Sequence, residues 1–96
     1  MITSKTRAKL RSLSNGTETL FQVGKTGISE NLIAAANDAI TARELIKLSV
    51  LETADTDTAE IAREIAEKIR AEVISVVGRK FVLYRENPKD KKIFID

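Results

Sequence analysis

Two segments of the chain carry apolar residues at the spacing of an amphipathic helix. In segment 29–41 the apolar face consists of Leu32, Ile33, Ala36, Ala39 and Ile40, and after the polar turn 53–58 it consists of Ile61, Ala62, Ile65, Ala66 and Ile69. Ser29 and Asp57 stand where side chains cap helix N-termini, and Glu60 completes a candidate capping box with Asp57. A third, weakly amphipathic helix is predicted from Thr3 or Ser4 to about Leu13, with Leu10 and Leu13 as its apolar edge.

Four further segments have the composition or alternation of β-strands. Leu20–Val23 is a short strand candidate, and segment 44–51 alternates, with Ile46, Leu48 and Val50 on one side and Lys47 and Ser49 on the other. Val73–Val77 and Phe81–Tyr84 are rich in β-forming residues and flank Gly78-Arg79. A two-residue connection that begins with Gly is typical of a type II′ hairpin turn.

The predicted order of elements is α-β-α-β-α-β-β, which indicates a two-layer α/β fold with a four-stranded mixed sheet. Each β-α-β step predicts parallel strands joined by a right-handed crossover, and the hairpin predicts an antiparallel last strand. The order of the strands across the sheet does not follow from the pattern. The 96 residues match the usual size of one domain, so residues 1–96 are expected to form a single domain.

Composition removes several classes of function. The chain has no Cys and no His, which excludes disulfides, Cys/His zinc sites, cysteine nucleophiles and histidine-based catalysis. The longest apolar run, Leu32–Ala36, is far too short for a membrane span, and the first residues do not open a signal peptide. We therefore expect a cytoplasmic protein that is not an enzyme, needs no metal or cofactor and contacts no membrane. A monomer is favoured, but the sequence leaves the oligomeric state open.

Charge is distributed unevenly along the chain. Segment 52–72 holds seven acidic and three basic residues, a net charge of −4, which leaves +6 for the rest. Four cations precede the first acidic residue, Glu18: Lys5, Arg7, Lys9 and Arg11. A domain with one acidic element and a basic remainder can present its positive side to a polyanion such as RNA, although solvation of charged helices alone would explain the same pattern.

The tetrapeptide Gly24-Lys25-Thr26-Gly27 lies between a predicted strand and a predicted helix. Paired glycines allow close approach of a ligand to the backbone, the helix N-terminus offers unpaired N–H groups, and Lys25 adds a positive charge, so the turn suits a phosphate. It is not a nucleotide-binding P-loop, because that pattern requires Gly at position 19, which is Thr19. A plain glycine-rich turn between two elements remains the alternative.

A second group of cations surrounds the predicted hairpin. Arg79 and Lys80 lie at its tip, and Arg85 follows the last strand. These side chains could contact phosphates, while Tyr84 is either a contact to a base or a residue at the edge of the core. Aromatic residues make up only 4% of the chain, so nucleic-acid binding would depend on phosphates and shape rather than on a platform of rings.

Three stretches in this order resemble the CRM domain, the module of chloroplast RNA splicing and ribosome maturation proteins, and in particular its bacterial YhbY-type single-domain form. They are Val23–Ser29, Arg43–Leu48 and Val77–Arg85. The resemblance implies a fold similar to the C-terminal domain of bacterial initiation factor 3. Two positions depart from the family pattern: Thr17-Glu18-Thr19 where Pro is frequent, and Arg43 where His is frequent.

The resemblance also implies RNA binding through the GxxG loop, by analogy with KH domains, and association with precursors of the large ribosomal subunit. The residues expected to contact RNA are Gly24, Lys25, Thr26, Gly27, Lys5, Arg7, Lys9, Arg11, Lys47, Arg79, Lys80 and Arg85. The alternative function is a protein-interaction module that docks a basic ribosomal protein through the acidic helix after residue 57. Which RNA is bound, and in what form, stays open at this point.

Overall fold

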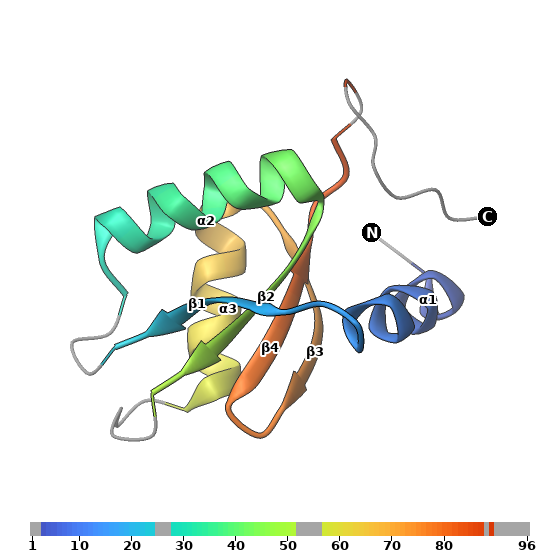
Figure 1. Ribbon diagram of the computed structural model, residues 1–96, viewed down its shortest axis with the longest axis horizontal. Coiled ribbons are helices and arrows are strands. Elements are labelled where there is room, and N and C mark those ends of the chain that lie inside the picture. The colour runs from blue at the N-terminus through green and yellow to red at the C-terminus, as the bar shows by residue number, and fades with distance from the viewer. Residues whose placement is uncertain (1–2, 25–27, 52–56, 88, 90–96) are drawn as a thin grey trace.

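The computed structural model describes residues 3–24, 28–51, 57–87 and 89. Within them the elements follow the predicted order: α1 (Ser4–Ser14), β1 (Thr19–Val23), α2 (Glu30–Arg43), β2 (Leu45–Val50), α3 (Thr58–Ile69), β3 (Glu72–Val77) and β4 (Lys80–Tyr84). The prediction of an α/β fold with a four-stranded mixed sheet is confirmed (Figure 1).

The sheet has the strand order β1-β2-β4-β3. β1 and β2 are parallel, whereas β4 is antiparallel to both of its neighbours, so β4 lies between β2 and β3. β4, the last strand in the described part of the chain, is thus a central strand. Both central strands are covered on their two faces, which explains why Phe81–Tyr84 are all buried instead of alternating.

The main core lies between the sheet and helices α2 and α3. It contains Ile46 and Leu48 of β2, Phe81 and Leu83 of β4, and the five predicted apolar residues of α3. The face predicted for α2 also packs on this core, with Ala36 and Ile40 fully buried. The periodicity therefore identified the inner face of both helices correctly.

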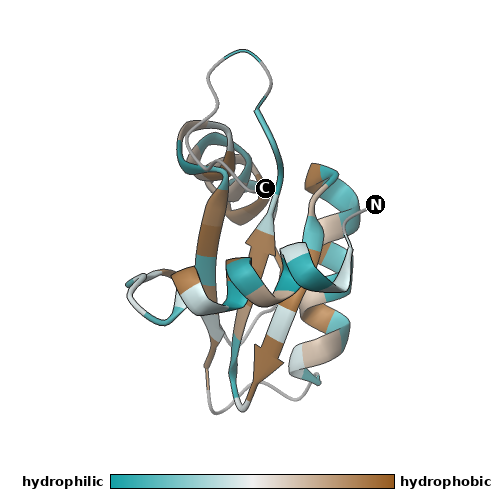
Figure 2. Ribbon diagram, turned by 90° about the vertical axis from the view of Figure 1, so that its right-hand side faces the viewer, coloured by the Kyte–Doolittle hydropathy of each residue, from teal (hydrophilic) through white to brown (hydrophobic). Residues whose placement is uncertain are grey.

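Helix α1 packs on the opposite face of the sheet, where it contacts β2, β3 and β4. Its Leu10 is fully buried in a second cluster with Leu45, Ile74, Val82 and Tyr84. In Figure 2, which is viewed from this side, α1 crosses in front of the strands. The expected two layers are consequently joined by a third, partial layer, and the second face of the sheet is only partly open to solvent.

The local signals at element ends are mostly confirmed. Thr3 caps α1 by accepting the Thr6 N–H, and Ser29 caps α2 by accepting the Leu32 N–H at 3.1 Å. Asp57 occupies the N-cap position of α3 but its side chain makes no capping bond, so the predicted capping box is absent there. Val77 pairs with Lys80 across the two-residue turn, and Gly78 has a φ of 61°, as a type II′ turn requires of its first central residue.

Candidate nucleic-acid interface

Four cations and no carboxylate lie on α1. Lys5, Lys9 and Arg11 are exposed, whereas Arg7 is half-buried. Because Leu10 anchors α1 to the sheet, the helix from which these charged side chains extend has a fixed position over the second sheet face. The predicted basic strip therefore exists as a helix surface, although Arg7 has a different environment from the others.

A groove of about 230 Å³ lies between the last turn of α1 and the hairpin end of the sheet. Three cations from three elements line it: Arg11 of α1, Lys47 of β2 and Lys80 of β4. None of the described residues that line this basic groove is acidic, and the others are Ser14, Asn15, Ser75, Val77 and Val82. Like charges converge here and none of the described lining residues neutralises them, so the groove is suited to an anion.

Lys47 is the innermost of the three cations. Its Nζ lies 3.4 Å from the carbonyl oxygen of Ser14, the last residue of α1, so its charge also offsets the negative end of the helix dipole. The Lys47 side chain is half-buried, and α1 rather than open solvent covers part of its strand face. Only one of the three ammonium N–H groups is needed for Ser14, and the others remain able to donate to a ligand.

At the hairpin tip, the side chain of Arg79 is exposed. The carbonyl oxygen of Arg79 accepts the Val50 N–H at 2.7 Å, which ties the turn to the end of β2. Lys80 follows as the first residue of β4 and reaches the basic groove. Of the two cations of the hairpin, Lys80 thus lines the groove and Arg79 lies outside its lining.

Only the first residue of the predicted GxxG loop is described; Lys25, Thr26 and Gly27 lie outside the described residues. Gly24 follows directly after β1, and a Cβ atom there would meet nothing within 4 Å. Its φ lies outside the left-handed range. Within the described part of the chain, neither a steric contact nor the backbone conformation requires glycine at this position.

Arg7 is bonded within the fold. Its guanidinium donates to the carbonyl oxygen of Val73 and, at 3.4 Å, to that of Ile74, and it lies 3.7 Å from the Glu72 carboxylate. The pairing of β3 with β4 is irregular between Val73 and Ser75. A bulge of this kind leaves carbonyl groups without a ladder partner, and Arg7 supplies the missing donor.

Arg85 likewise has several internal partners. Its guanidinium donates to the carbonyl oxygen of Ile69 at 2.7 Å, to Asn37 Oδ1 at 2.8 Å and to the Thr41 hydroxyl. It therefore lies on the side of α2 and α3, on the sheet face opposite the basic groove. The structure does not bring Arg85 together with the other predicted RNA-contacting residues.

Glu44, which belongs to one of the family-like stretches, has a structural role. It is fully buried and ends α2 with a φ of 66°. Its Oε2 accepts the Asn87 N–H at 2.7 Å, and its carbonyl oxygen accepts the Arg85 N–H at 2.9 Å. The residue turns the chain from α2 into β2 and anchors the segment that leaves β4.

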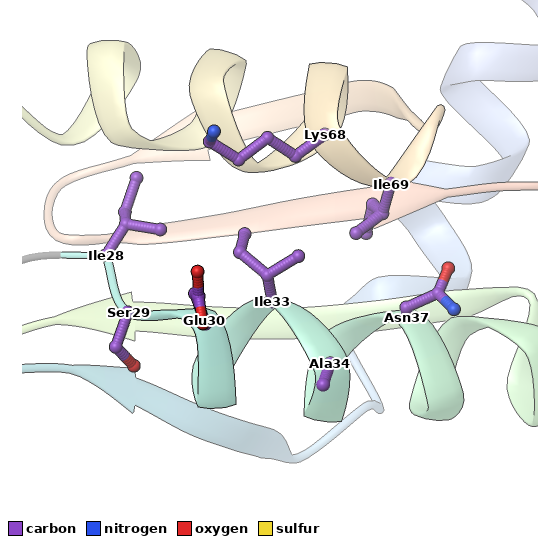
Figure 3. Close-up of a pocket in the computed structure, with 8 residues that line it drawn as sticks. All are labelled: Ile28, Ser29, Glu30, Ile33, Ala34, Asn37, Lys68 and Ile69. Atoms are coloured by element: carbon purple, nitrogen blue, oxygen red, sulfur yellow. The ribbon is translucent and has the colours of Figure 1, made fainter.

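A second groove, of about 550 Å³, lies between α2 and α3 (Figure 3). Ile28 and Ile33 point from the α2 side towards α3, and the Lys68 side chain extends along α3 in the direction of Ile28. Ile69 and Ala34 complete its apolar lining, and Ser29, Glu30 and Asn37 provide polar atoms. This groove contains one cation and one carboxylate, in contrast to the basic groove.

Among the described residues, no group of three or more acidic side chains is arranged to hold a metal ion. In the same part of the chain, none of the helices combines the length and the apolar character that a bilayer crossing needs. The structural features that stand out are therefore a cationic helix and a cationic groove on one face of a mixed sheet. They define a small α/β module of the kind that binds polyanions.

Comparison with known proteins gives the family. Residues 2–85 match the model of the CRS1 / YhbY (CRM) domain, and the chain belongs to this family. It is 37% identical to "Probable RNA-binding protein YqeI" of Bacillus subtilis, over 97% of each chain. A probable RNA-binding protein of Methanocaldococcus jannaschii is also 37% identical, over 95% of this chain and 69% of its own length.

The solution structure of the protein SAV1595 from Staphylococcus aureus has the same fold, with a TM-score of 0.84 and 40% sequence identity over the whole of both chains. The resemblance found in the sequence is thereby confirmed, together with the fold that it implied. CRM domains are non-catalytic modules, so this chain is not an enzyme.

Proposed function

We propose that this protein binds ribosomal RNA in precursor particles of the large subunit. The observation that carries the proposal is the convergence of Arg11, Lys47 and Lys80 on one groove whose described lining contains no acidic residue. Phosphate groups are the anions that such a groove would meet on RNA. The family membership and the names of the relatives support RNA as the polyanion.

The interface in this proposal runs over the α1 face of the sheet. Its centre is the basic groove, with Lys5 and Lys9 along α1 and Arg79 at the hairpin tip as outer contacts. The loop Gly24–Gly27 supplies a separate phosphate contact through its backbone, Lys25 and Thr26. Open space at Gly24 supports this assignment, because the fold itself gives no reason for glycine there.

Arg7 and Arg85 act differently in this proposal. Both side chains donate hydrogen bonds to backbone carbonyl oxygens within the fold, so we assign them to the support of β3 and of the α2–α3 junction. A guanidinium that leaves a buried carbonyl oxygen to meet RNA would sacrifice those bonds. Their substitution should therefore change stability more than RNA affinity.

The test of the electrostatic interface is RNA affinity as a function of salt concentration. Lys80→Ala and Arg11→Ala should each weaken binding about three- to tenfold and lower the log–log slope by about 0.7–0.9 per lost phosphate contact. Arg63→Ala is the matched control, because Arg63 is an exposed cation on α3, on the other face of the sheet. If all three variants behave alike, the charge of the whole domain rather than this groove attracts RNA, and the assigned interface is wrong.

The ribosomal part of the proposal needs a test in cells. Crosslinking the protein to RNA in growing cells, followed by mapping of the attached positions, should yield sites within ribosomal RNA of large-subunit precursors. Sedimentation should place the protein with particles that contain those precursors. Crosslinks that fall mainly on other RNAs would contradict the ribosomal assignment while leaving RNA binding intact.

A protein-interaction module remains the second candidate function. The groove between α2 and α3 favours it, because Ile28, Ile33 and Ile69 give the groove an apolar lining, and α3, which forms one of its sides, also carries exposed acidic residues. Reversal of Glu60, Glu64 and Glu67 to Lys separates the two functions. Protein docking predicts lost association with the particles and unchanged or increased RNA affinity, whereas RNA binding alone predicts that association survives.

A further inference from the structure

Three large hydrophobic side chains are exposed in the described part of the chain: Leu13, Val76 and Val77. Val77 is the most exposed of them at 72%, and it is also the one that lines the basic groove. The groove thus combines three cations with an aliphatic surface that the fold leaves open to water. Cations alone would suffice for a phosphate, so the apolar part indicates a ligand with an apolar face.

RNA offers such a face only where a nucleotide is unpaired. In a duplex the bases are stacked inside, and the surface presents phosphates, hydroxyl groups and base edges. A volume of about 230 Å³ is also smaller than the ~300–1,000 Å³ typical of sites for drug-sized ligands. It is large enough for a single base or ribose and too small to enclose a base-paired helix, whose phosphates can still meet the cations at its rim.

None of the described residues that line the groove is aromatic. Phe81 and Tyr84 of the neighbouring strand are only 1% and 6% exposed and belong to the two cores. The hydroxyl of Ser75 and the amide of Asn15, which also line the groove, add hydrogen-bonding groups for a base edge or a 2′-hydroxyl. The groove would therefore recognise a nucleotide through aliphatic contact and hydrogen bonds rather than through stacking on a ring.

We propose that the basic groove holds one unpaired nucleotide of the RNA, with its phosphate on Arg11 and Lys80 and its base or ribose against Val77. The proposal rests on the proposed RNA-binding function and specifies its substrate as RNA that contains single-stranded nucleotides. Val77 is then a specificity-determining residue, because it favours unpaired over paired RNA without adding charge.

The adjacent residue on the same strand provides a matched control. Val76 pairs with Phe81, whose side chain lies in the core on the α2–α3 side, whereas Val77 pairs with Lys80 of the groove. The two valines therefore lie on opposite faces of β3 at its exposed end. Both variants replace Val by Ser at the exposed end of the same strand, and only Val77→Ser removes an apolar surface from the groove.

The experiment compares the binding of each protein to a single-stranded RNA oligonucleotide and to a duplex of the same length, over a range of salt concentrations. Val77→Ser should weaken single-strand binding about three- to fivefold, by loss of buried apolar area, while its salt slope stays unchanged. Its duplex affinity should equal that of the wild type. Lys80→Ala should lower affinity and slope for both RNAs, and Val76→Ser should change neither.

Equal losses by Val77→Ser on both RNAs, or no loss on the single strand, would overturn the inference even where Lys80→Ala still weakens binding and supports the proposed function. If the wild type binds neither RNA, the proposed function itself fails together with the inference. Thermal unfolding of both valine variants guards against a folding artefact, since comparable midpoints make the difference in RNA binding specific to the groove.

Discussion

The guanidinium of Arg85 donates a hydrogen bond of 2.7 Å to the carbonyl oxygen of Ile69, the last residue of α3. The same guanidinium reaches Asn37 and Thr41 of α2. One side chain just beyond β4 thereby joins the C-terminal end of one helix to the flank of another. Removal of Arg85 leaves a helix-end carbonyl without this donor and weakens the contact between the two helices.

Arg85→Ala should lower the free energy of unfolding by about 1–3 kcal/mol, because hydrogen bonds from a charged donor contribute in this range. Urea denaturation measures the change. Arg43→Ala, which removes an exposed cation from the end of α2, should change stability by less than about 0.5 kcal/mol. An Arg85 variant of wild-type stability and much reduced RNA affinity would show that Arg85 contacts RNA after all.

Glu44→Gln should destabilise the protein by about 1–2 kcal/mol, because the buried carboxylate that accepts the Asn87 N–H at 2.7 Å is replaced by a neutral acceptor. The comparison is Glu64→Gln on the exposed side of α3, where little change is expected. Denaturant midpoints of the two variants should differ clearly. Equal midpoints would mean that the chain after β4 is held in place without this bond.

Leu10→Ala should cost about 2–4 kcal/mol, since Leu10 is fully buried and is the only residue of α1 in the second core cluster. Leu13→Ala, in the same helix at 50% exposure, should cost much less. Hydrogen exchange in α1 should accelerate more in Leu10→Ala than exchange in α3. RNA affinity should fall with it, because the groove loses the scaffold of Arg11.

Two glycines should respond differently to the same substitution. Gly78→Ala should destabilise the hairpin by about 1 kcal/mol, because Gly78 has a φ of 61° that a residue with a Cβ adopts at a cost.

Gly24→Ala should leave the unfolding midpoint unchanged or slightly raised, since nothing lies within 4 Å of the added carbon. RNA affinity should nevertheless drop in Gly24→Ala, because the methyl group blocks approach to the loop backbone. Wild-type affinity in this variant would argue against a phosphate at the loop entrance.

Local patterns in the sequence were sufficient to predict the elements and their inner faces. The five apolar residues predicted for the inner face of α3 all lie in the core, because a sustained 3.6-residue period leaves little ambiguity even though Asp57 makes no capping bond. The hairpin turn was also predicted correctly, from Gly78-Arg79 and the β-forming segments on either side of it. In contrast, the central place of β4 depends on contacts between distant segments, such as Leu48 with Phe81, which no local pattern encodes.

The position of α1 was harder to predict because a single leucine anchors it. A signal was nevertheless present: Phe81–Tyr84 contains no polar residue, as expected of a strand covered on both faces. The site prediction was limited in the same way, because it also depends on where α1 lies relative to the sheet. Lys47 and Lys80 were recognised as cations, but Val77 and Ser75 were not singled out, because only the strand register places them beside Arg11.

The strand order has a consequence for how the chain acquires its structure during synthesis. In the finished sheet β2 lies between β1 and β4, and β4 is completed only at Tyr84, after all the other helices and strands that the structure describes. Until then the apolar side chains of β2 lack half of their final surroundings, and the groove lacks Lys80. We therefore expect the four-stranded sheet to be completed late in synthesis, and a chain that stops at Val77 should lack both the central strand β4 and the Lys80 side chain of the basic groove.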